Sequence, residues 1–499
     1  MSEHFDLLIV GAGISGIGMA CQLQKESPGK KYAVLERRDA VGGTWDLFRY
    51  PGVRSDSDMF SFAYGFKPWM SPKVLAEGGL VRDYVSQTAR EFGVDRHIRF
   101  GLKILSASWS TDRGIWTISA LQEATGELKT YTSCFLVSCT GYYDYDKAYL
   151  PDFTGMESFE GQCIHPQFWP ERLDYKGKKV VIIGSGATAV TLVPAMVADA
   201  AHVTMLQRTP TYYFSAPNLE KFIVVLGKVF PAQWIYSGLR STYISLQRAL
   251  YKSAKRWPQA MQKFFLRPVK RALGTRVDMR HFTPDYMPWD QRLCVVPNGD
   301  LFKAFKSGKA SVVTDEISSF TENGILLKSG ELLDADIIVT ATGLRLKTFG
   351  GIEVSVDGKT LATNQLLSYR AVLMQNIPNM AFIFGYTNAS WTLKADIASR
   401  YVCRLLNYMD SRGIASVTPR APAGQVDAGN VLSSLTSGYV RRDIDELPRQ
   451  GRSGPWRVTH AYEVDKVLLL DEAIDDGLLE FTQFDRFESP SLRSMPAAV

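Results

Sequence analysis

Two short glycine-rich turns have the residue types and spacing that hold the pyrophosphate of a dinucleotide. They are Gly11-x-Gly13-x-x-Gly16 and Gly184-x-Gly186-x-x-Ala189. The first glycine of such a turn permits the tight bend, the second lets the phosphates approach the backbone, and a small third residue lets helix and strand pack closely. The helix that follows offers free N–H groups and a partial positive charge. The pair predicts two dinucleotide sites.

A residue downstream of each turn distinguishes the two sites. Glu36 stands 20 residues after Gly16, where an acid can hold the two hydroxyls of a ribose. Arg208 stands 19 residues after Ala189, where a guanidinium suits the 2′-phosphate of NADP. The alternative for Arg208 is that it only covers the end of a strand, because arginine is common on protein surfaces.

The segment Gly42–Asp56 indicates which dinucleotide the first turn binds. It reads GGTWDLFRYPGVRSD and is rich in glycine, aromatic and charged residues. A domain that binds only NAD would normally turn into another helix here. Charged loop residues beside a cofactor, such as Arg54 and Asp56, favour a functional loop over a surface loop that only buries Trp45. We therefore assign FAD to the first turn and NADP to the second.

The elements that must position these turns follow the pattern strand, turn, helix, strand. Apolar runs precede both turns, and strand-like runs at 135–139 and 335–340 each end in a glycine turn. This pattern predicts an α/β fold with two Rossmann-like (doubly wound) domains, the FAD domain being interrupted by the NADPH domain. The expected boundaries are 1–142 and 333–499 for the FAD domain with the C-terminal region, 143–216 and 286–332 for the NADPH domain, and 217–285 for a helical insertion.

The expected insertion differs in composition from both domains. Residues 217–280 are rich in aromatic, Lys and Arg residues, poor in glycine, and helical in period. We favour a helical lid packed on the second domain with a solvated basic face. Contact of these basic aromatic helices with a membrane surface is the alternative.

Bulk composition excludes several other classes of protein. Of 499 residues 45% are hydrophobic and 22% charged, and the net charge of +6 is too small to argue for nucleic acid. The six cysteines form no CxxC pair, which argues against disulfides and a metal site. No signal peptide precedes the first strand, and Lys228 and Pro231 interrupt the most apolar stretch, Phe222–Leu239. We expect a cytoplasmic protein with no transmembrane segment and a frayed tail at Ser489–Val499.

Five segments resemble type I Baeyer–Villiger monooxygenases, which are class B flavin monooxygenases. Phe159-x-Gly161-x-x-x-His165-x-x-x-Trp169-Pro170 is similar to the fingerprint that precedes their NADPH turn, and Gly42–Asp56 fills a second fingerprint of that family. Pro288–Arg292, Ala341–Gly343 and Gly385–Asn388 also fit. The resemblance runs from about residue 5 to about residue 480 in motif order and is greatest to the EthA-like subgroup.

The resemblance implies roles for the matched positions. FAD would contact Gly11, Gly13, Ser15, Gly16, Glu36, Thr44, Trp45, Asp46, Leu47, Asp56 and the backbone of Ile104. NADP(H) would contact Arg54, Ser55, Asp56, Ile183, Gly184, Ser185, Gly186, Ala187, Thr188, Ala189, Gln207 and Arg208. Arg292 matches the active-site arginine. Many family members carry a lysine before that arginine to grip the 2′-phosphate, but this chain has Gln291, which puts the strength of NADPH selection in doubt.

The implied reaction consumes NADPH and O₂ and inserts oxygen into a ketone through a C4a-peroxyflavin, giving an ester or lactone. Arg292 would stabilise the anionic oxygens, and Asp56 would orient Arg292. For His165 we weigh a hinge role that couples NADPH binding to closure against a histidine that only holds a loop. Trp391 is expected on the substrate side, and the alternative is a plain core tryptophan.

Three alternatives compete with this reading. Oxygenation of sulfur or nitrogen overlaps with it, since many such enzymes also oxidise thioethers, but Trp169-Pro170 and Arg292 favour ketones. A flavin disulfide reductase needs a redox CxxC, which the sequence lacks. A non-oxygenating redox or binding flavoprotein stays open. The sequence ranks no ketone by chain length or ring size, and it leaves the oligomeric state undecided.

Overall fold

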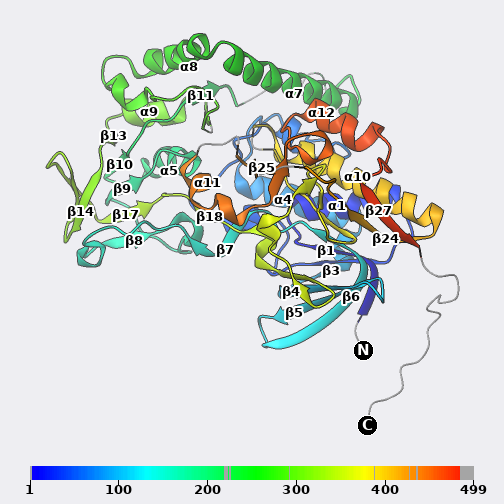
Figure 1. The fold of residues 1–499 in the computed structure, drawn as a ribbon. Helices are drawn as coiled ribbons and strands as arrows, with labels where there is room; N and C mark the ends of the chain where they lie inside the picture. The colour runs from blue at the N-terminus through cyan, green and yellow to red at the C-terminus, as the bar shows by residue number, and fades with distance from the viewer. Residues whose placement is uncertain are drawn as a thin grey trace.

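Two α/β units lie beside one another in the computed structural model, and two helices run along one edge of both (Figure 1). The structure describes residues 3–218, 223, 226, 228–291, 293–386, 388–425, 427–433 and 437–483. Arg292, the expected active-site arginine, and the expected frayed tail Ser489–Val499 lie outside the described residues.

The first unit is built on an 11-stranded sheet whose central strands flank the first glycine turn. β1 (Glu3–Val10) pairs in parallel with β2 (Tyr32–Leu35) and β6 (Glu127–Ser138), and α1 (Ile14–Glu26) connects β1 to β2. Residues 7–10 are buried because both faces of this central strand are covered, which explains the continuous apolar run. The other strands of this sheet are β3 (Ile98–Arg99), β4 (Leu102–Ser110), β5 (Ile115–Gln122), β19 (Glu353–Val356), β20 (Lys359–Thr360), β21 (Ser368–Tyr369), β22 (Leu373–Met374) and β23 (Met380–Phe382).

The second unit contains a five-stranded parallel sheet in the order β13-β10-β9-β17-β8. Its strands are β13 (Ala310–Thr314), β10 (His202–Gln207), β9 (Lys179–Ile183), β17 (Ile337–Thr340) and β8 (Gln162–Ile164). Helix α5 (Ala187–Met196) follows the second glycine turn. Strand pairing places β17 in this sheet, beyond the expected boundary at residue 332. Since the first sheet draws strands from both sides of this segment, the predicted fold of two Rossmann-like units, one interrupting the other, is confirmed.

Smaller sheets connect the two units or lie at their edges. β7 (Tyr143–Ala148) pairs with β18 (Leu344–Leu346), so the two crossings between the units lie side by side. The rest are β11 (Tyr213–Ala216) with β12 (Cys294–Pro297), β14 (Ile317–Thr321) with β15 (Gly324–Leu327) and β16 (Leu332–Asp334), β24 (Ile414–Pro419) with β27 (Leu479–Gln483), and β25 (Asp427–Asn430) with β26 (Arg449–Gly451). Further helices are α2 (Thr44–Leu47), α3 (Met59–Phe62), α4 (Gly78–Glu91), α9 (Asp300–Lys306), α10 (Trp391–Arg412), α11 (Gly438–Arg442) and α12 (Tyr462–Lys466).

In the described part of the expected helical insertion, two long helices bridge the units. α7 (Ala232–Arg256) packs against α3 of the first unit, whereas α8 (Pro258–Leu273) packs against β11 and α9 of the second (Figure 1). Arg240 of α7 pairs with the buried Asp396 of α10 at 3.2 Å and also donates to three backbone carbonyls beside α3. None of the helices that the structure describes is long and apolar enough to cross a bilayer.

A loop of the first unit is wedged against the second unit at Gly52. Its φ of +78° lies in the left-handed region, and an added Cβ would sit 2.5 Å from the Thr191 carbonyl oxygen of α5. Tyr50 of the same loop hydrogen-bonds Thr188 and Thr191, which opposes the rise in the Tyr50 pKa that burial causes. The loop that begins at the first dinucleotide turn therefore rests on the helix of the second.

We predict that Gly52→Ala destabilises the protein more than Gly29→Ala. Both glycines have positive φ, but an added Cβ at Gly29 meets nothing within 4 Å. The strained backbone costs about 1–2 kcal/mol at either position, and the clash at Gly52 adds about 1–3 kcal/mol. Urea unfolding of both variants measures the difference. An equal loss in free energy of unfolding for the two variants would show that the close approach of Gly52 to α5 does not contribute to stability.

Candidate functional site: a dinucleotide cradle that opens into an apolar cavity

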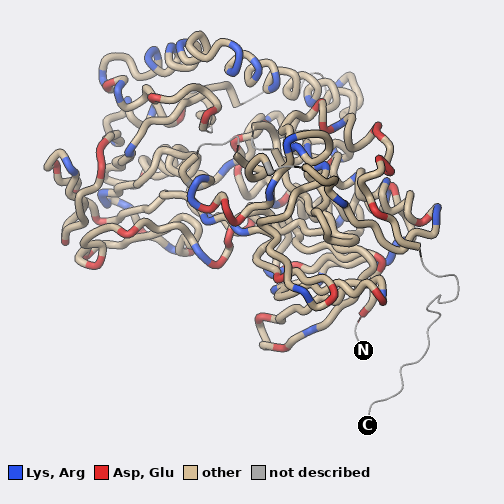
Figure 2. Tube along the Cα trace, viewed as in Figure 1, with Lys and Arg blue, Asp and Glu red and all other residues tan. Residues whose placement is uncertain are grey.

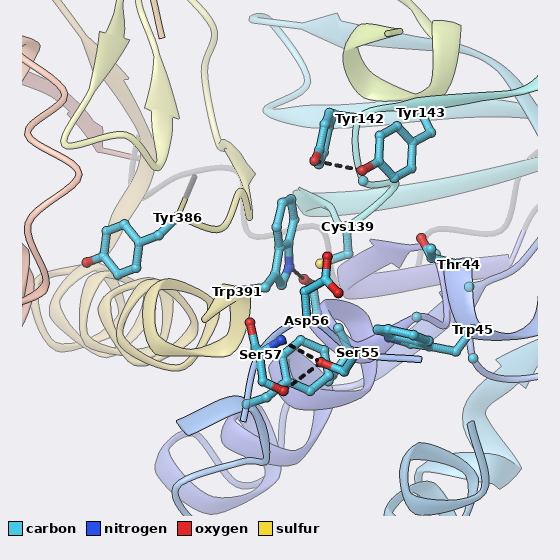
Figure 3. A pocket seen from close by; sticks show the side chains of 18 of the residues that line it. Thr44, Trp45, Ser55, Asp56, Ser57, Cys139, Tyr142, Tyr143, Tyr386 and Trp391 are labelled. Atoms are coloured by element: carbon cyan, nitrogen blue, oxygen red, sulfur yellow. Dashed lines mark hydrogen bonds between the residues drawn. The ribbon is translucent and has the colours of Figure 1, made fainter. Parts of the chain in front are cut away.

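One cavity of about 850 Å³ extends from the first glycine turn to helices α7 and α8. Figure 3 shows the part of its lining around Asp56 and Trp391. Most of the residues expected at the first cofactor site line it, and they come from the glycine turn, α2, the loop after it and β4. They are Gly11, Gly13, Ser15, Glu36, Thr44, Trp45, Asp56 and Ile104. Arg54 and Ser55, which were expected to contact NADP(H), line the same cavity. Gly16, Asp46 and Leu47 stand behind this lining rather than in it.

The first turn has the shape that a pyrophosphate requires. A Cβ at Gly16 would sit 1.8 Å from the Gly11 carbonyl oxygen, so only glycine lets α1 begin this close to β1. Gly13 is the N-cap of α1, makes no side-chain cap hydrogen bond, and no acid stands in the first helical turn. The positive end of α1 is therefore available to an anionic group.

Glu36 ends β2 at the rim of the cradle. Its carboxylate accepts hydrogen bonds from the backbone N–H groups of Ala12 at 2.6 Å and Arg38 at 2.8 Å. Burial raises the pKa of Glu36, and these two hydrogen bonds oppose the rise. The carboxylate is thus held in one orientation, from which it can accept ribose hydroxyl groups. Asp46 acts differently, because it is buried in ion pairs with Arg38 and Arg49 that fix α2.

The loop Arg54–Asp56 connects the cradle to the second unit. Arg54 Nη1 pairs with Asp300 Oδ2 of α9 at 2.7 Å. Its Nε and Nη2 are buried and hydrogen-bond none of the described residues. Buried guanidinium donors are costly unless they are hydrogen-bonded, so this residue fits a polar ligand group in the cavity. The Asp56 carboxylate is directed into the cavity (Figure 3).

The second turn does not reach this cavity. Residues Ile183, Gly184, Ser185, Gly186, Ala187, Thr188 and Ala189 form the end of β9, the turn and the start of α5, with Gly186 as an N-cap without a side-chain bond. Gln207 faces inward and donates to His281 O and Thr314 Oγ1 at 2.7 and 2.8 Å. Arg208, next in the chain, is exposed. The structure therefore keeps the two predicted dinucleotide turns apart.

Two arginines that the sequence analysis missed gather near Arg208. Arg442 and Arg345 lie over the ring of Tyr149, with guanidinium carbons 3.4 and 5.9 Å from the ring centroid. Burial lowers the pKa of Arg442, and the positive charges of Arg345 and Arg208 lower it further. The three arginines are distant in sequence, so no local motif could have predicted this cationic cluster.

The fingerprint around His165 lies at the crossing between the units and does not line the cavity. His165 Nδ1 accepts from the Gln167 N–H at 3.1 Å, so the neutral ring carries its proton on Nε2, which donates to Gly343 O at 3.2 Å. Burial lowers the pKa of His165, and the Gly343 carbonyl opposes that shift. Phe159 is buried, Gly161 packs tightly on the Asp336 carbonyl, and Trp169 and Pro170 follow in the same segment. These contacts show a loop-holding geometry, and the hinge role stays a prediction.

The far wall of the cavity is apolar and was not foreseen. Trp391, expected on the substrate side, lines the cavity and donates from Nε1 to Ser15 Oγ at 2.8 Å. Further apolar lining comes from β11, α7, α8, β12 and the segment before β12, namely Phe214, Leu246, Leu250, Phe265, Trp289, Leu293 and Val295. Such a wall excludes water and accepts an apolar molecule next to the cradle.

Comparison with known proteins gives one consistent result. The family model described as flavin-binding monooxygenase-like matches residues 6–412. MymA of Mycobacterium tuberculosis is 56% identical over 96% of this chain and 98% of its own length, and EthA, an FAD-containing monooxygenase of the same species, is 49% identical over 97% and 99%. The structure of oxidized steroid monooxygenase bound to NADP superposes with a TM-score of 0.77, covering 96% of this chain and 100% of that one at 21% identity.

We predict that His165 makes the protein less stable in acid. Because the pKa of His165 is lowered in the folded state, the unfolded chain takes up a proton first as the pH falls through about 6.5. The contribution of His165 is therefore full above that pH and declines below it. Urea unfolding should be measured from about pH 8 to about pH 5. The difference in free energy of unfolding between wild type and His165→Gln should become smaller as the pH falls. The prediction is contradicted if this difference in free energy of unfolding stays constant with pH. It is also contradicted if the difference between wild type and His4→Gln becomes smaller to the same extent.

Proposed function

This chain belongs to the flavin-binding monooxygenase-like family, and within it we propose an FAD-dependent Baeyer–Villiger monooxygenase of the EthA-like subgroup. It would use NADPH and O₂ to insert oxygen into apolar ketones, and it would also oxidise thioethers. The observation that carries this proposal is the single cavity that joins the first dinucleotide cradle to an apolar wall. An enzyme that passed electrons only between cofactors would need no apolar chamber beside its flavin.

The cradle residues fit FAD in three respects. The pyrophosphate would lie over the uncapped start of α1, the ribose would meet Glu36, and the adenine would lie against the backbone of Ile104. Bound FAD supplies hydride acceptance and oxygen activation, chemistry that no side chain provides. The donors Arg54 Nε and Nη2 would meet a polar group of a cofactor in the cavity.

The side chains around the cavity would manage charge and water. A guanidinium stays protonated throughout the working pH range, so Arg292 would stabilise negative charge that develops on the oxygen of the substrate. Its neighbours in sequence, Gln291 and Leu293, line the cavity. Asp56, directed into the same space, would orient Arg292. The apolar wall would exclude bulk water, which strengthens these charge interactions.

NADPH would bind at the second turn. The helix start at Gly186 is suited to its pyrophosphate, and Arg208 would hold the 2′-phosphate together with Arg345 and Arg442. This cluster could supply the positive charge that Gln291 does not. Because the second turn lies outside the cavity, the nicotinamide end would have to extend past the loop Arg54–Asp56 to reach the flavin.

We predict that Arg292→Ala retains FAD and accepts electrons from NADPH but forms no ester from a ketone. The loss of a charge-stabilising donor typically lowers kcat by roughly 100- to 1,000-fold. Ester formation and oxygen uptake should be measured together with a cyclic ketone, a linear ketone and a thioether, with Gln291→Ala as the control. Normal ester formation by Arg292→Ala excludes the role of Arg292. Lack of NADPH-driven oxygen uptake by the wild type would favour a non-oxygenating flavoprotein.

We predict that Arg208→Ala raises the KM for NADPH much more than the KM for NADH. Removal of a charge-assisted phosphate contact costs about 1.5–3 kcal/mol, or roughly 10- to 150-fold. Arg442→Ala should show the same selectivity to a smaller degree, whereas Arg113→Ala, in the turn between β4 and β5, should leave both values unchanged. If the ratio of the KM for NADPH to the KM for NADH is unaltered in Arg208→Ala, Arg208 does not bind the 2′-phosphate.

A further inference from the structure

The bridging helices α7 and α8 carry charge of a single sign. Between residues 232 and 273 there is no Asp or Glu, and there are nine basic residues: Arg240, Arg248, Lys252, Lys255, Arg256, Lys263, Arg267, Lys270 and Arg271. Figure 2 shows this as a run of blue without red along the edge of the molecule that α7 and α8 form.

Ion pairing divides these nine residues into two groups. The α7 residues Arg240, Arg248, Lys252 and Lys255 pair with acids of neighbouring elements, namely Asp396, Glu463 and Asp290. Arg256 and the four basic residues of α8 form no ion pair with any residue that the structure describes. Intramolecular pairing therefore explains four of the five charges of α7, but neither Arg256 at its end nor the charges of α8.

Large apolar side chains accompany these unpaired charges. Trp257 is 60% exposed and Phe264 48% exposed, and together with Met261 and Pro268 they line a shallow hollow that Arg267 and Arg271 also border. Met261, Phe264 and Pro268 share one face of α8, since they recur every three to four residues, and Trp257, which directly precedes the helix, lines the same hollow. The adjacent face of α8, with Phe265, Val269 and Leu273, is the one buried in the body of the protein.

We propose that the outer face of α8, defined as Trp257, Met261, Phe264 and Pro268 with the flanking residues Arg256, Lys263, Arg267, Lys270 and Arg271, docks on an anionic lipid bilayer. A helix with aromatic residues on one side and Lys and Arg beside them is suited to the headgroup boundary, where rings insert and cations meet lipid phosphates. Long basic side chains keep their charges at the headgroups while their stems cover apolar surface.

Charge distinguishes a bilayer from the other partners of an apolar face. A second copy of this face would bring its unpaired cations against the same cations, which repel one another. A neutral apolar partner would cover the rings but leave the cations without counter-charge. An anionic bilayer satisfies both features at once, and it does so over a surface broad enough for the whole length of α8.

Docking in this orientation would place the membrane close to the cavity. Phe264 points outward, whereas its neighbour Phe265 is 2% exposed and lines the cavity. One helix, about 10 Å across, therefore separates the docking face from the cavity. The docking proposal itself does not depend on the proposed oxygenation chemistry, because it concerns only the outer face.

Co-sedimentation of the FAD-loaded protein with vesicles tests the proposal. The vesicles are phosphatidylcholine alone or phosphatidylcholine mixed with phosphatidylglycerol. Wild type should bind the mixed vesicles, bind the neutral ones weakly, and lose binding as salt rises. Lys263→Gln/Arg271→Gln should bind roughly 30-fold more weakly, and Trp257→Ser/Phe264→Ser roughly 10-fold or more.

Matched controls come from the opposite end of the molecule. Leu128 is 65% exposed on β6 and Arg113 is exposed in the turn between β4 and β5, so Leu128→Ser and Arg113→Gln remove the same kinds of side chain elsewhere. Both should bind as wild type does, and ketone turnover in detergent-free buffer should not change in any variant. Equal binding to both kinds of vesicle, no binding at low salt, or equal losses in the control variants would overturn the proposal, as would self-association that Trp257→Ser/Phe264→Ser abolishes.

Discussion

The pairing of Arg54 with Asp300 holds together the parts of the site that the chain builds separately. Arg54 belongs to the loop that starts at the first dinucleotide turn, and Asp300 begins α9 of the second unit. Gly52 packs on α5 two residues earlier in the same loop. A single segment is thereby fixed to both units, which sets where Asp56 enters the cavity. Arg54 itself lines the cavity, so this contact lies between the cradle and the apolar wall.

Helices α7 and α8 also connect the two units, and they form part of the outer surface. α7 is fixed to the first unit by the buried pair of Arg240 and Asp396, and burial of one partner without the other would be costly. Burial raises the pKa of Asp396, and the charge of Arg240 opposes that rise. α8 continues onto the second unit, so the pair of helices covers the cavity from one unit to the other. The inner side of these helices supplies cavity wall, while the outer side carries the unpaired cations.

The distance between the two dinucleotide turns limits how the proposed reaction can proceed. Only the first turn opens into the cavity, so a nucleotide held at the second must reach the flavin across the loop Arg54–Asp56. The contacts of that loop with α5 and α9 then link the position of the second unit to the geometry of the chamber. His165 lies at the crossing between the units and is held by two backbone hydrogen bonds.

The sequence by itself determined the features that depend on neighbours along the chain. The glycine spacing predicted both turns, and apolar runs predicted β1 and β9. The distance of Glu36 from Gly16 predicted its position at the rim of the first dinucleotide cradle. Only the tertiary structure decided which of these residues share a space. The cavity wall and the cluster of Arg208, Arg345 and Arg442 combine residues hundreds of positions apart, and Asp46 and Gln207 turned out to face internal partners. Local spacing determines backbone conformation within a unit, whereas packing between units is set by contacts such as Arg54 with Asp300, which no local pattern encodes.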